Sequence, residues 1–326
     1  MDYHMNMAGE NPLQGMPFGF QDYVKRRKSM ENSKLSGNGL PDYAFSMDFE
    51  LRKKLDAIPQ LYNIGKKICG TVASRCMQEY NRAALLVGPD QFPDVYQIGC
   101  DCARRLGIGI PNIYIVNDPS LNAFTYATDD IAPLIVVHSG LYERFTPGEL
   151  RCVIGHECGH IHNQHGVYNM LGQILLTGGL QAMVGAVPAY ALTLLTVSSQ
   201  LALSAWSRAA EVTCDRAGLI CCERVEDAYQ VNAKLMYGAA LGEHNTVNLD
   251  ALRSQLELQM SNMAKMDELW ADHPSSARRI VAEMEFAECE VFYRWRPELK
   301  SPGQIMRIKE ETDGRCRRFV DVMKKG

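Results

Sequence analysis

Three short segments alternate apolar and polar residues or run apolar throughout, as β-strands do. They are "NIYIVND" (112–118), "NAFTYAT" (122–128) and "APLIVVH" (132–138). Each is rich in β-branched or aromatic residues and is bounded by turn-forming residues. Most of the remaining chain from Asp42 onward has the spacing of helices. The pattern therefore predicts an α+β protein that is mostly helical and has a small sheet.

A helix is expected soon after the third strand, because the signals for its start are strong. Thr146 is a common capping residue, Pro147 fits the first helical position, and Glu149 completes a capping box. An apolar stripe through Val153 and Ile154 follows. The residues that come next are therefore predicted to lie on a packed, rigid helix with the sheet just before it.

The distribution of polar residues divides the chain into three parts. Residues 1–40 are rich in Met, Asn, Gly, Ser and Pro and are expected to form a flexible tail. Residues 41–290 carry most of the predicted elements and are expected to form one domain. Residues 291–326 are expected to form a helical extension, with "RCRR" (315–318) on a solvated helix.

Residues 166–207 contain no Asp, Glu, Lys, Arg or His, and the run is long enough for two membrane spans of about 20 residues each. Gln173, Pro188 and several glycines dilute it, and no aromatic belt or lysine cluster marks both ends. These features favour a helical insertion wrapped by the rest of a soluble protein or by a homo-oligomer. Membrane association through this stretch is the alternative.

Composition narrows the classes of function. The net charge of -4 gives no general attraction to nucleic acid or to an anionic membrane, so no nucleic-acid partner is expected. The 11 cysteines are an odd number without paired CxxC spacing, and the first residues lack a charged-then-apolar secretory pattern. A reducing cytoplasm fits best, and a membrane-associated location is the alternative.

The stretch "HECGH", which begins at His156, has the HExxH spacing of zinc hydrolases. On a helix, positions i and i+4 differ by only about 40°, so His156 and His160 share a face and can hold one ion. Glu157 is expected beside that ion rather than on it, within reach of a metal-bound water. His162 and His165 are expected to face elsewhere, since they lie about 200° from His160 and about 180° from His156 on the same wheel. The alternative is a chance cluster on a solvated helix.

Two histidines leave a hydrolytic zinc site incomplete, because it needs three protein ligands and one open position. The extended pattern HExxHxxGxxH is absent, since Asn163 and Gly166 stand where it needs Gly and His. Downstream, Glu211 and Asp215 are i and i+4 on one predicted helix face, with Arg208 one turn earlier. Glu211 is the candidate third ligand, and Asp215 is the candidate acceptor that orients a ligand imidazole. The alternative is a surface acid pair with arginine partners.

Between about Asp42 and Phe286 the chain resembles the gluzincin metallopeptidases of the HtpX and CAAX-prenyl-protease type. The resemblance rests on the ordered motifs "NAF" (122–124), "VVHSGLYERFTPGELRCVIGHECGHI" (136–161), "SRAAEVTCD" (207–215) and "HPSSARRI" (273–280). Membrane members of the family, such as HtpX, carry transmembrane helices between the HExxH and the glutamate. The resemblance therefore does not decide whether residues 166–207 touch lipid.

The resemblance implies that His156, His160 and Glu211 bind one Zn²⁺ per chain, with Glu157 as the catalytic base. Cys214 departs from the family pattern, in which alanine is common at this place. A small thiol packed in the core is the expected explanation.

The resemblance also implies roles beyond the metal ligands. His273 is expected to donate to the oxygen of the reacting carbonyl, and Arg279 to hold His273 or to pair with a nearby carboxylate. Asn122, Ala123 and Phe124 are expected to bind substrate, because an extended peptide can add to the edge of a sheet lying beside the HExxH helix. The alternatives are a capping or packing role for His273 and a turn at Asn122.

Together these features predict a zinc-dependent metalloendopeptidase that hydrolyses extended or unfolded protein segments by attack of a zinc-bound water. The alternative is a non-catalytic, zinc-stabilised, chaperone-like scaffold that binds such segments without cutting them. Glu157 favours the enzyme, because a purely structural metal needs no base beside it.

Overall fold

The computed structural model describes residues 40–128, 131–176, 197–237, 248, 250–252, 254–255 and 276–321. The expected tail up to residue 39, the middle of the uncharged stretch (177–196) and His273 lie outside these residues. Within them the chain is mostly helical with one four-stranded sheet, which confirms the predicted class. The elements are α2 (Ser46–Asp56), α3 (Pro59–Ala83), β1 (Leu85–Leu86), α4 (Pro93–Leu106), β2 (Asn112–Val116), β3 (Ala123–Thr128), β4 (Ile131–His138), α5 (Ser139–Arg144), α6 (Pro147–His162), α7 (Gly166–Leu176), α9 (Val197–Cys221), α10 (Val225–Tyr237), α13 (Ser276–Ala287), α14 (Glu290–Trp295), η2 (Pro297–Leu299) and α15 (Lys309–Val320).

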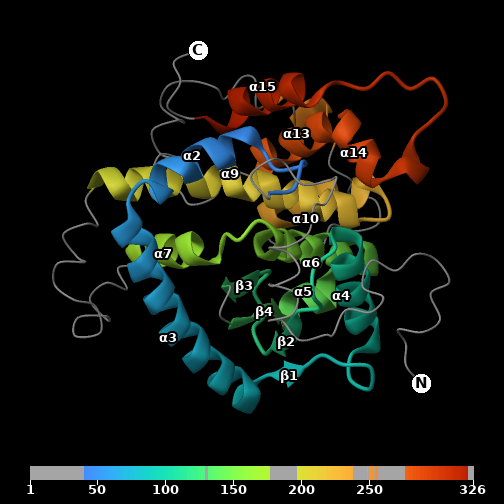
Figure 1. Cartoon of the computed structure of the whole chain (residues 1–326). Coiled ribbons are helices and arrows are strands. Elements are labelled where there is room, and N and C mark those ends of the chain that lie inside the picture. The colour runs from blue at the N-terminus through green and yellow to red at the C-terminus, as the bar shows by residue number, and fades with distance from the viewer. Residues whose placement is uncertain are drawn as a thin grey trace.

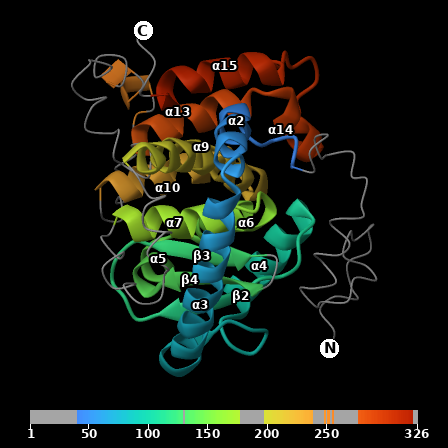
Figure 2. The same ribbon diagram turned by 60° about the vertical axis from the view of Figure 1, so that its left-hand side comes forward.

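The sheet has the strand order β1-β2-β4-β3, so that β1 and β3 form its edges. β2 and β4 are parallel, and the other two pairs are antiparallel. The three strands expected from the pattern are confirmed, with ends that differ by no more than two residues. One face carries Ile113 and Val137 into the main core with α4 and α6. The other carries Tyr114 and Val136 toward α3, which crosses the sheet in Figure 2.

Helix α6 begins as the capping signals predicted. The hydroxyl of Thr146 accepts from the backbone N–H of Glu149 at 3.3 Å, and the Glu149 carboxylate accepts from the N–H of Thr146 at 2.7 Å. The same buried carboxylate accepts from Lys234 of α10 at 2.7 Å. These bonds fix the start of α6, which lies between the sheet and α9 (Figure 1).

Helices α6 and α9 lie close together because small residues face each other. A Cβ added at Gly159 would lie 2.8 Å from Ala217 Cβ and 3.0 Å from Cys214 Cα, which is closer than carbon atoms pack. Glycine at position 159 therefore permits the close approach. As a result, residues 156–160 of α6 lie against residues 211–215 of α9.

Helices α2, α13 and α15 pack over α9 on the side away from α6 (Figure 1). Phe45, next to α2, shares an apolar cluster with Val212 of α9 and Cys316 of α15. Buried Arg216 of α9 pairs with Asp313 of α15 at 2.7 Å. The expectation that residues 315–318 lie on a solvated helix is wrong for Cys316, which is fully buried because α15 turns one face toward this layer.

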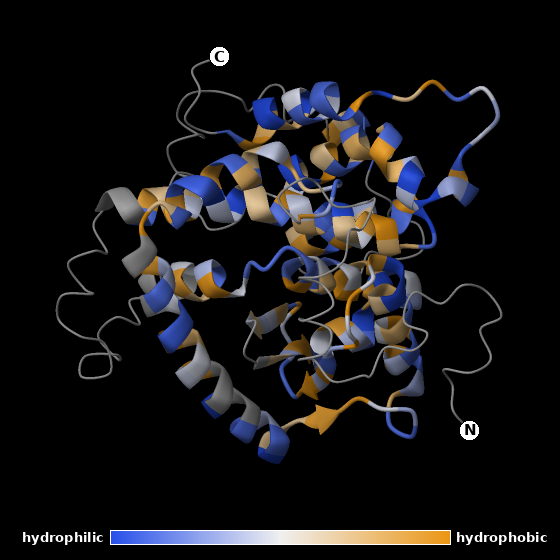
Figure 3. Ribbon diagram, viewed as in Figure 1, coloured by the Kyte–Doolittle hydropathy of each residue, from blue (hydrophilic) through white to orange (hydrophobic). Residues whose placement is uncertain are grey.

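The uncharged stretch contributes α7 and the first part of α9. Tyr168, Leu171 and Trp206 from these helices are buried with residues of α3. Figure 3 shows apolar and polar positions mixed along both helices. In the part of the chain that the structure describes, no helix combines the length and the apolar character needed to cross a membrane.

Candidate active site

Three side chains from two helices converge between α6 and α9. His156 Nε2 lies 3.4 Å from Glu211 Oε2, and His160 Nε2 lies 3.5 Å from Glu211 Oε1. Two ligands that each lie about 2.1 Å from a tetrahedral ion are about 3.4 Å apart, so this spacing fits Zn²⁺. Two imidazoles and one carboxylate are also a donor set that zinc accepts. The structure therefore brings the three predicted ligands together.

Cys214 offers a second way to complete a metal cluster. Its sulfur and one ring nitrogen each of His156 and His160 lie within 4.8 Å of one another. The Glu211 oxygens lie 3.4 and 3.5 Å from the Nε2 atoms of His156 and His160. Burial, and then the Glu211 carboxylate, raise the pKa of the Cys214 thiol well above its usual value, which keeps the thiol protonated. Glu211 therefore remains the candidate third ligand, and Cys214 fits a packed thiol.

Asp215 contacts His156 and is itself held by Arg279. Asp215 Oδ1 lies 3.0 Å from His156 Nδ1, so this nitrogen carries a proton and Nε2 faces Glu211. Arg279 of α13 donates from Nε to Asp215 Oδ2 at 2.8 Å and from Nη2 to Oδ1 at 2.5 Å. Its Nη1 lies 3.6 Å from Glu211. The arrangement orients the imidazole and neutralises part of the buried negative charge.

The acid–base balance of this cluster follows from burial and charge. Burial lowers the pKa of His156, but Glu211 and Asp215 outweigh burial and raise it to about 10. Burial raises the pKa of Asp215, but Arg279 and His156 together outweigh burial and hold this pKa below its usual value. A proton therefore competes with a metal ion for the Nε2 of His156.

Glu157 lies beside the three ligands, and strand β3 holds its carboxylate. Thr125 Oγ1 donates to Glu157 Oε2 at 2.6 Å, and Glu157 is only 5% exposed. The alternation of a strand places Ala123 on the same face as Thr125, toward α6, and Phe124 on the opposite face, against Tyr80 of α3. Thr125 was not among the residues predicted for the site, although it follows "NAF" directly and shares the face of Ala123.

The other predicted residues lie as follows. Asn122 is exposed at the start of β3, and its carbonyl accepts from the N–H of His138 at 3.0 Å. β3 pairs with β4 on one side, and among the described residues no strand pairs with its other side. His273 lies outside the described residues.

The end of α6 places His165 differently from the helical wheel. α6 ends at His162, and Gln164 adopts the left-handed conformation with φ 59°. The chain therefore folds back, and His165 Nδ1 lies 3.1 Å from Nδ1 of His160. His165 Nε2 in turn lies 3.1 Å from Asp48 Oδ2 on α2. The expectation that His165 faces away from the site is wrong, because it assumed an unbroken helix.

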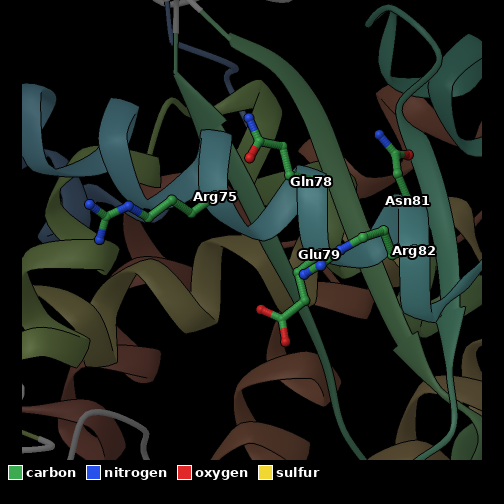
Figure 4. Close-up of a pocket in the computed structure, with 5 residues that line it drawn as sticks. All are labelled: Arg75, Gln78, Glu79, Asn81 and Arg82. Atoms are coloured by element: carbon green, nitrogen blue, oxygen red, sulfur yellow. The ribbon is translucent and has the colours of Figure 1, made fainter.

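A surface hollow lies along α3 (Figure 4) and contains no member of the ligand cluster. It is lined by Arg75, Gln78, Glu79, Asn81 and Arg82. Charges of both signs line it, and all five side chains are exposed. Nothing in this arrangement connects it to hydrolytic chemistry.

Comparisons with known proteins agree with the geometry. The model of Peptidase family M48 matches residues 89–285, which include the zinc-ligand candidates, Glu157 and Arg279. The chloroplastic "Plastoglobule-localized metallopeptidase 48" of Arabidopsis thaliana is 33% identical over 215 residues, which are 66% of this chain and 60% of that protein. A "Protease HtpX homolog" of Streptococcus uberis is 42% identical over 74 residues, 23% of this chain and 25% of that protein. The matched regions thus span less than two thirds of either relative. No solved structure matches the chain. The predicted resemblance to HtpX-like metallopeptidases is confirmed.

Proposed function

The chain belongs to peptidase family M48, and we propose that it is a zinc-dependent endopeptidase that cleaves extended or unfolded protein segments. The observation that carries the proposal is the convergence of His156, His160 and Glu211 beside buried Glu157. Zinc held by these three ligands, one ion per chain, would supply a Lewis acid that polarises a peptide carbonyl and acidifies water.

Glu157 acts first as a general base and then as a general acid. Its carboxylate accepts the proton of the attacking water and returns it to the leaving amine. The Thr125 hydroxyl, 2.6 Å from Oε2, holds this carboxylate in one orientation. A base that is already oriented loses less entropy on the way to the transition state.

His273 and Arg279 act in different ways. His273 donates a hydrogen bond to the oxygen of the reacting carbonyl, where negative charge develops. Arg279 acts indirectly, because its guanidinium pairs with Asp215, which orients His156. The support for Arg279 is this two-point contact with Asp215.

The substrate binds as an extended strand along the outer edge of β3. Thr125 of this strand contacts Glu157, so a peptide paired with β3 from residues 122–124 onward would pass the ligand cluster. Pairing through the backbone tolerates many side chains, which suits cleavage of unfolded segments.

The location that fits best is a reducing cytoplasm, with membrane association through residues 166–207 as the alternative. The support is that the ten cysteines whose side chains the structure describes are all free and buried. Free thiols in this number are typical of reducing compartments.

The test is casein hydrolysis by the purified protein, measured together with its zinc content. The wild type is expected to hold one zinc per chain and to cleave casein. Glu157→Gln should keep the zinc and lose about 100-fold or more of the rate. Glu226→Gln makes the same change at a side chain that is 61% exposed on α10, and it should cleave like the wild type.

Equal residual hydrolysis by the wild type and Glu157→Gln would refute the enzymatic function. If both proteins then held zinc and bound unfolded casein without cutting it, the non-catalytic, zinc-stabilised scaffold would be the better description.

A further inference from the structure

A second line of hydrogen bonds runs from the ligand cluster to helix α2. His160 Nδ1 lies 3.1 Å from His165 Nδ1, and His165 Nε2 lies 3.1 Å from Asp48 Oδ2. The exposed fractions of His160, His165 and Asp48 are 6%, 0% and 3%. The line therefore crosses the interior of the protein and joins α6 to a helix more than a hundred residues earlier in the chain.

The carboxylate of Asp48 is held in place by donors from α9. Trp206 Nε1 donates to Oδ1 at 2.8 Å, and Thr213 Oγ1 donates to Oδ2 at 2.7 Å. The Trp206 ring also packs edge-on against His165, with ring centroids 5.4 Å apart. Because α9 also carries Glu211, one helix sets the position of both the third ligand and the far end of this line.

The zinc site determines the direction of each bond. If His160 binds the ion through Nε2, its proton is on Nδ1, and the neighbouring Nδ1 of His165 must accept it. His165 then carries its own proton on Nε2 and donates it to Asp48, which as a carboxylate only accepts. The order of donors and acceptors is thus complete from the ligand to the carboxylate.

The amide of Asn169 agrees with a proton on His160 Nδ1. This amide lies with its nitrogen 3.0 Å from that ring nitrogen, and Asn169 Oδ1 is buried without a hydrogen-bond partner. Turning the amide by 180° brings Oδ1 to the ring nitrogen, where it accepts the same proton. This orientation gives the buried oxygen a partner, whereas an unprotonated Nδ1 would leave it without one.

We propose that Asp48 and His165 are positioning residues for the zinc ligand His160, as Asp215 is for His156. Partners of this kind fix the tautomer and the orientation of a ligand imidazole and raise its basicity. Asp48 precedes residues 89–285, which match the family model, so the proposal gives helix α2 a part in the site. It rests on the proposed zinc-binding function.

The test is the affinity for Zn²⁺, measured on the purified full-length protein by competition with a chromophoric chelator. Asp48→Asn should weaken zinc binding about 10- to 100-fold. The reason is that the new amide NH₂ group would face Nε2 of His165, so the ring proton of His165 would move to Nδ1. The protonated Nδ1 of His165 would then face the protonated Nδ1 of His160, and neither nitrogen could accept. Asp56→Asn removes the same charge from the same helix, at a carboxylate that accepts from Tyr168 instead of a histidine, and should bind zinc like the wild type.

A double variant separates positioning from general structural damage. His165→Phe keeps an aromatic ring against Trp206 but removes both ring nitrogens. If Asp48 acts through His165, adding Asp48→Asn to His165→Phe should cause no further loss of affinity, whereas additive losses would overturn the proposal. ¹⁵N NMR of the imidazoles in the zinc-bound wild type gives an independent readout. A proton on Nε2 of His165 supports the proposal, and a proton on Nδ1 contradicts it.

These outcomes distinguish the inference from the proposed function. A wild type that binds no zinc refutes the zinc site itself. A wild type that binds zinc, together with a folded Asp48→Asn protein of equal affinity, refutes only the positioning role. Two zinc ions per chain, with one lost in Cys214→Ala, would assign His165 to a second metal site and would also overturn the positioning role.

Discussion

Removing Arg279 tests how much the candidate site depends on the guanidinium between its carboxylates. Arg279 pairs with Asp215 and lies 3.6 Å from Glu211, and these two carboxylates are only 3% and 5% exposed. Arg279→Leu keeps much of the apolar stem and removes the charge. In the metal-free protein, two buried carboxylates then lose a positive partner.

The size of the effect follows from this burial. Removing one member of a buried ion pair costs about 3–5 kcal/mol, because the remaining charge is left uncompensated. An unfolding entropy of about 2.1 cal/mol/K per residue gives about 0.7 kcal/mol/K for the chain of 326 residues. The melting temperature of the metal-free protein should therefore fall by about 4–7 °C. Bound zinc should reduce this loss, since a divalent cation beside Glu211 compensates part of the charge.

Thermal and urea unfolding of the metal-free and zinc-loaded proteins measure this effect. Arg279→Lys keeps the charge but loses the two-point donor geometry, so it should cost less than Arg279→Leu. Arg224→Leu, at a side chain that is 69% exposed, is the matched control and should change stability by less than about 0.5 kcal/mol. If metal-free Arg279→Leu melts like the wild type, or if zinc does not narrow the difference, Arg279 is not the counter-charge of this site.

Three further changes test other parts of the structure. Gly159→Ala sets a methyl group against α9 and should lower the free energy of unfolding by about 1–3 kcal/mol, as measured by urea titration. Gly172→Ala is the control, because nothing lies within 4 Å of a Cβ added there, and it should not lower the free energy of unfolding. Thr125→Val removes the hydroxyl that holds the carboxylate of Glu157, the proposed base, and should lower kcat for casein about 10-fold with KM little changed. This factor corresponds to about 1.5 kcal/mol for a hydrogen bond to a charged group, and an unaltered kcat would contradict the role of Thr125. Burial raises the pKa of Asp313, but Arg216 and Lys309 together outweigh burial and lower this pKa. The contribution of Asp313 to stability is therefore present above its ordinary pKa of 3.8 and is lost as the pH falls through the lower pKa of the folded state. From about pH 6 to about pH 3, the unfolding free energy of Asp313→Asn should therefore fall less steeply than that of the wild type.

Much of the fold near the site could be predicted because its signals are local. Thr146 and Glu149 form the predicted capping box, since both residues belong to one turn of one helix. Strands β2, β3 and β4 were predicted from local alternation or from short apolar runs. In the same way, His156 and His160 had to share a face on any helix that continued between them.

Other parts of the site depended on contacts that no local pattern contains. Glu211 was found because it stands one helical turn from Asp215 and because the order of motifs resembles a known family. The hydroxyl of Thr125 could not be assigned to Glu157 before the packing of β3 on α6 was known. Cys316 was expected on a solvated helix because its neighbours are arginines, yet it is buried under α2 and α13.

The sequence by itself determined which side chains share a helix or strand face, because that depends only on backbone geometry over a few residues. The tertiary structure alone decided that α6 and α9 meet closely enough for Glu211 to reach both imidazoles. It also decided that α6 stops at His162, so that His165 returns to His160 and meets Asp48. These contacts join segments far apart in the chain, and their geometry is set by how whole helices pack and where they end.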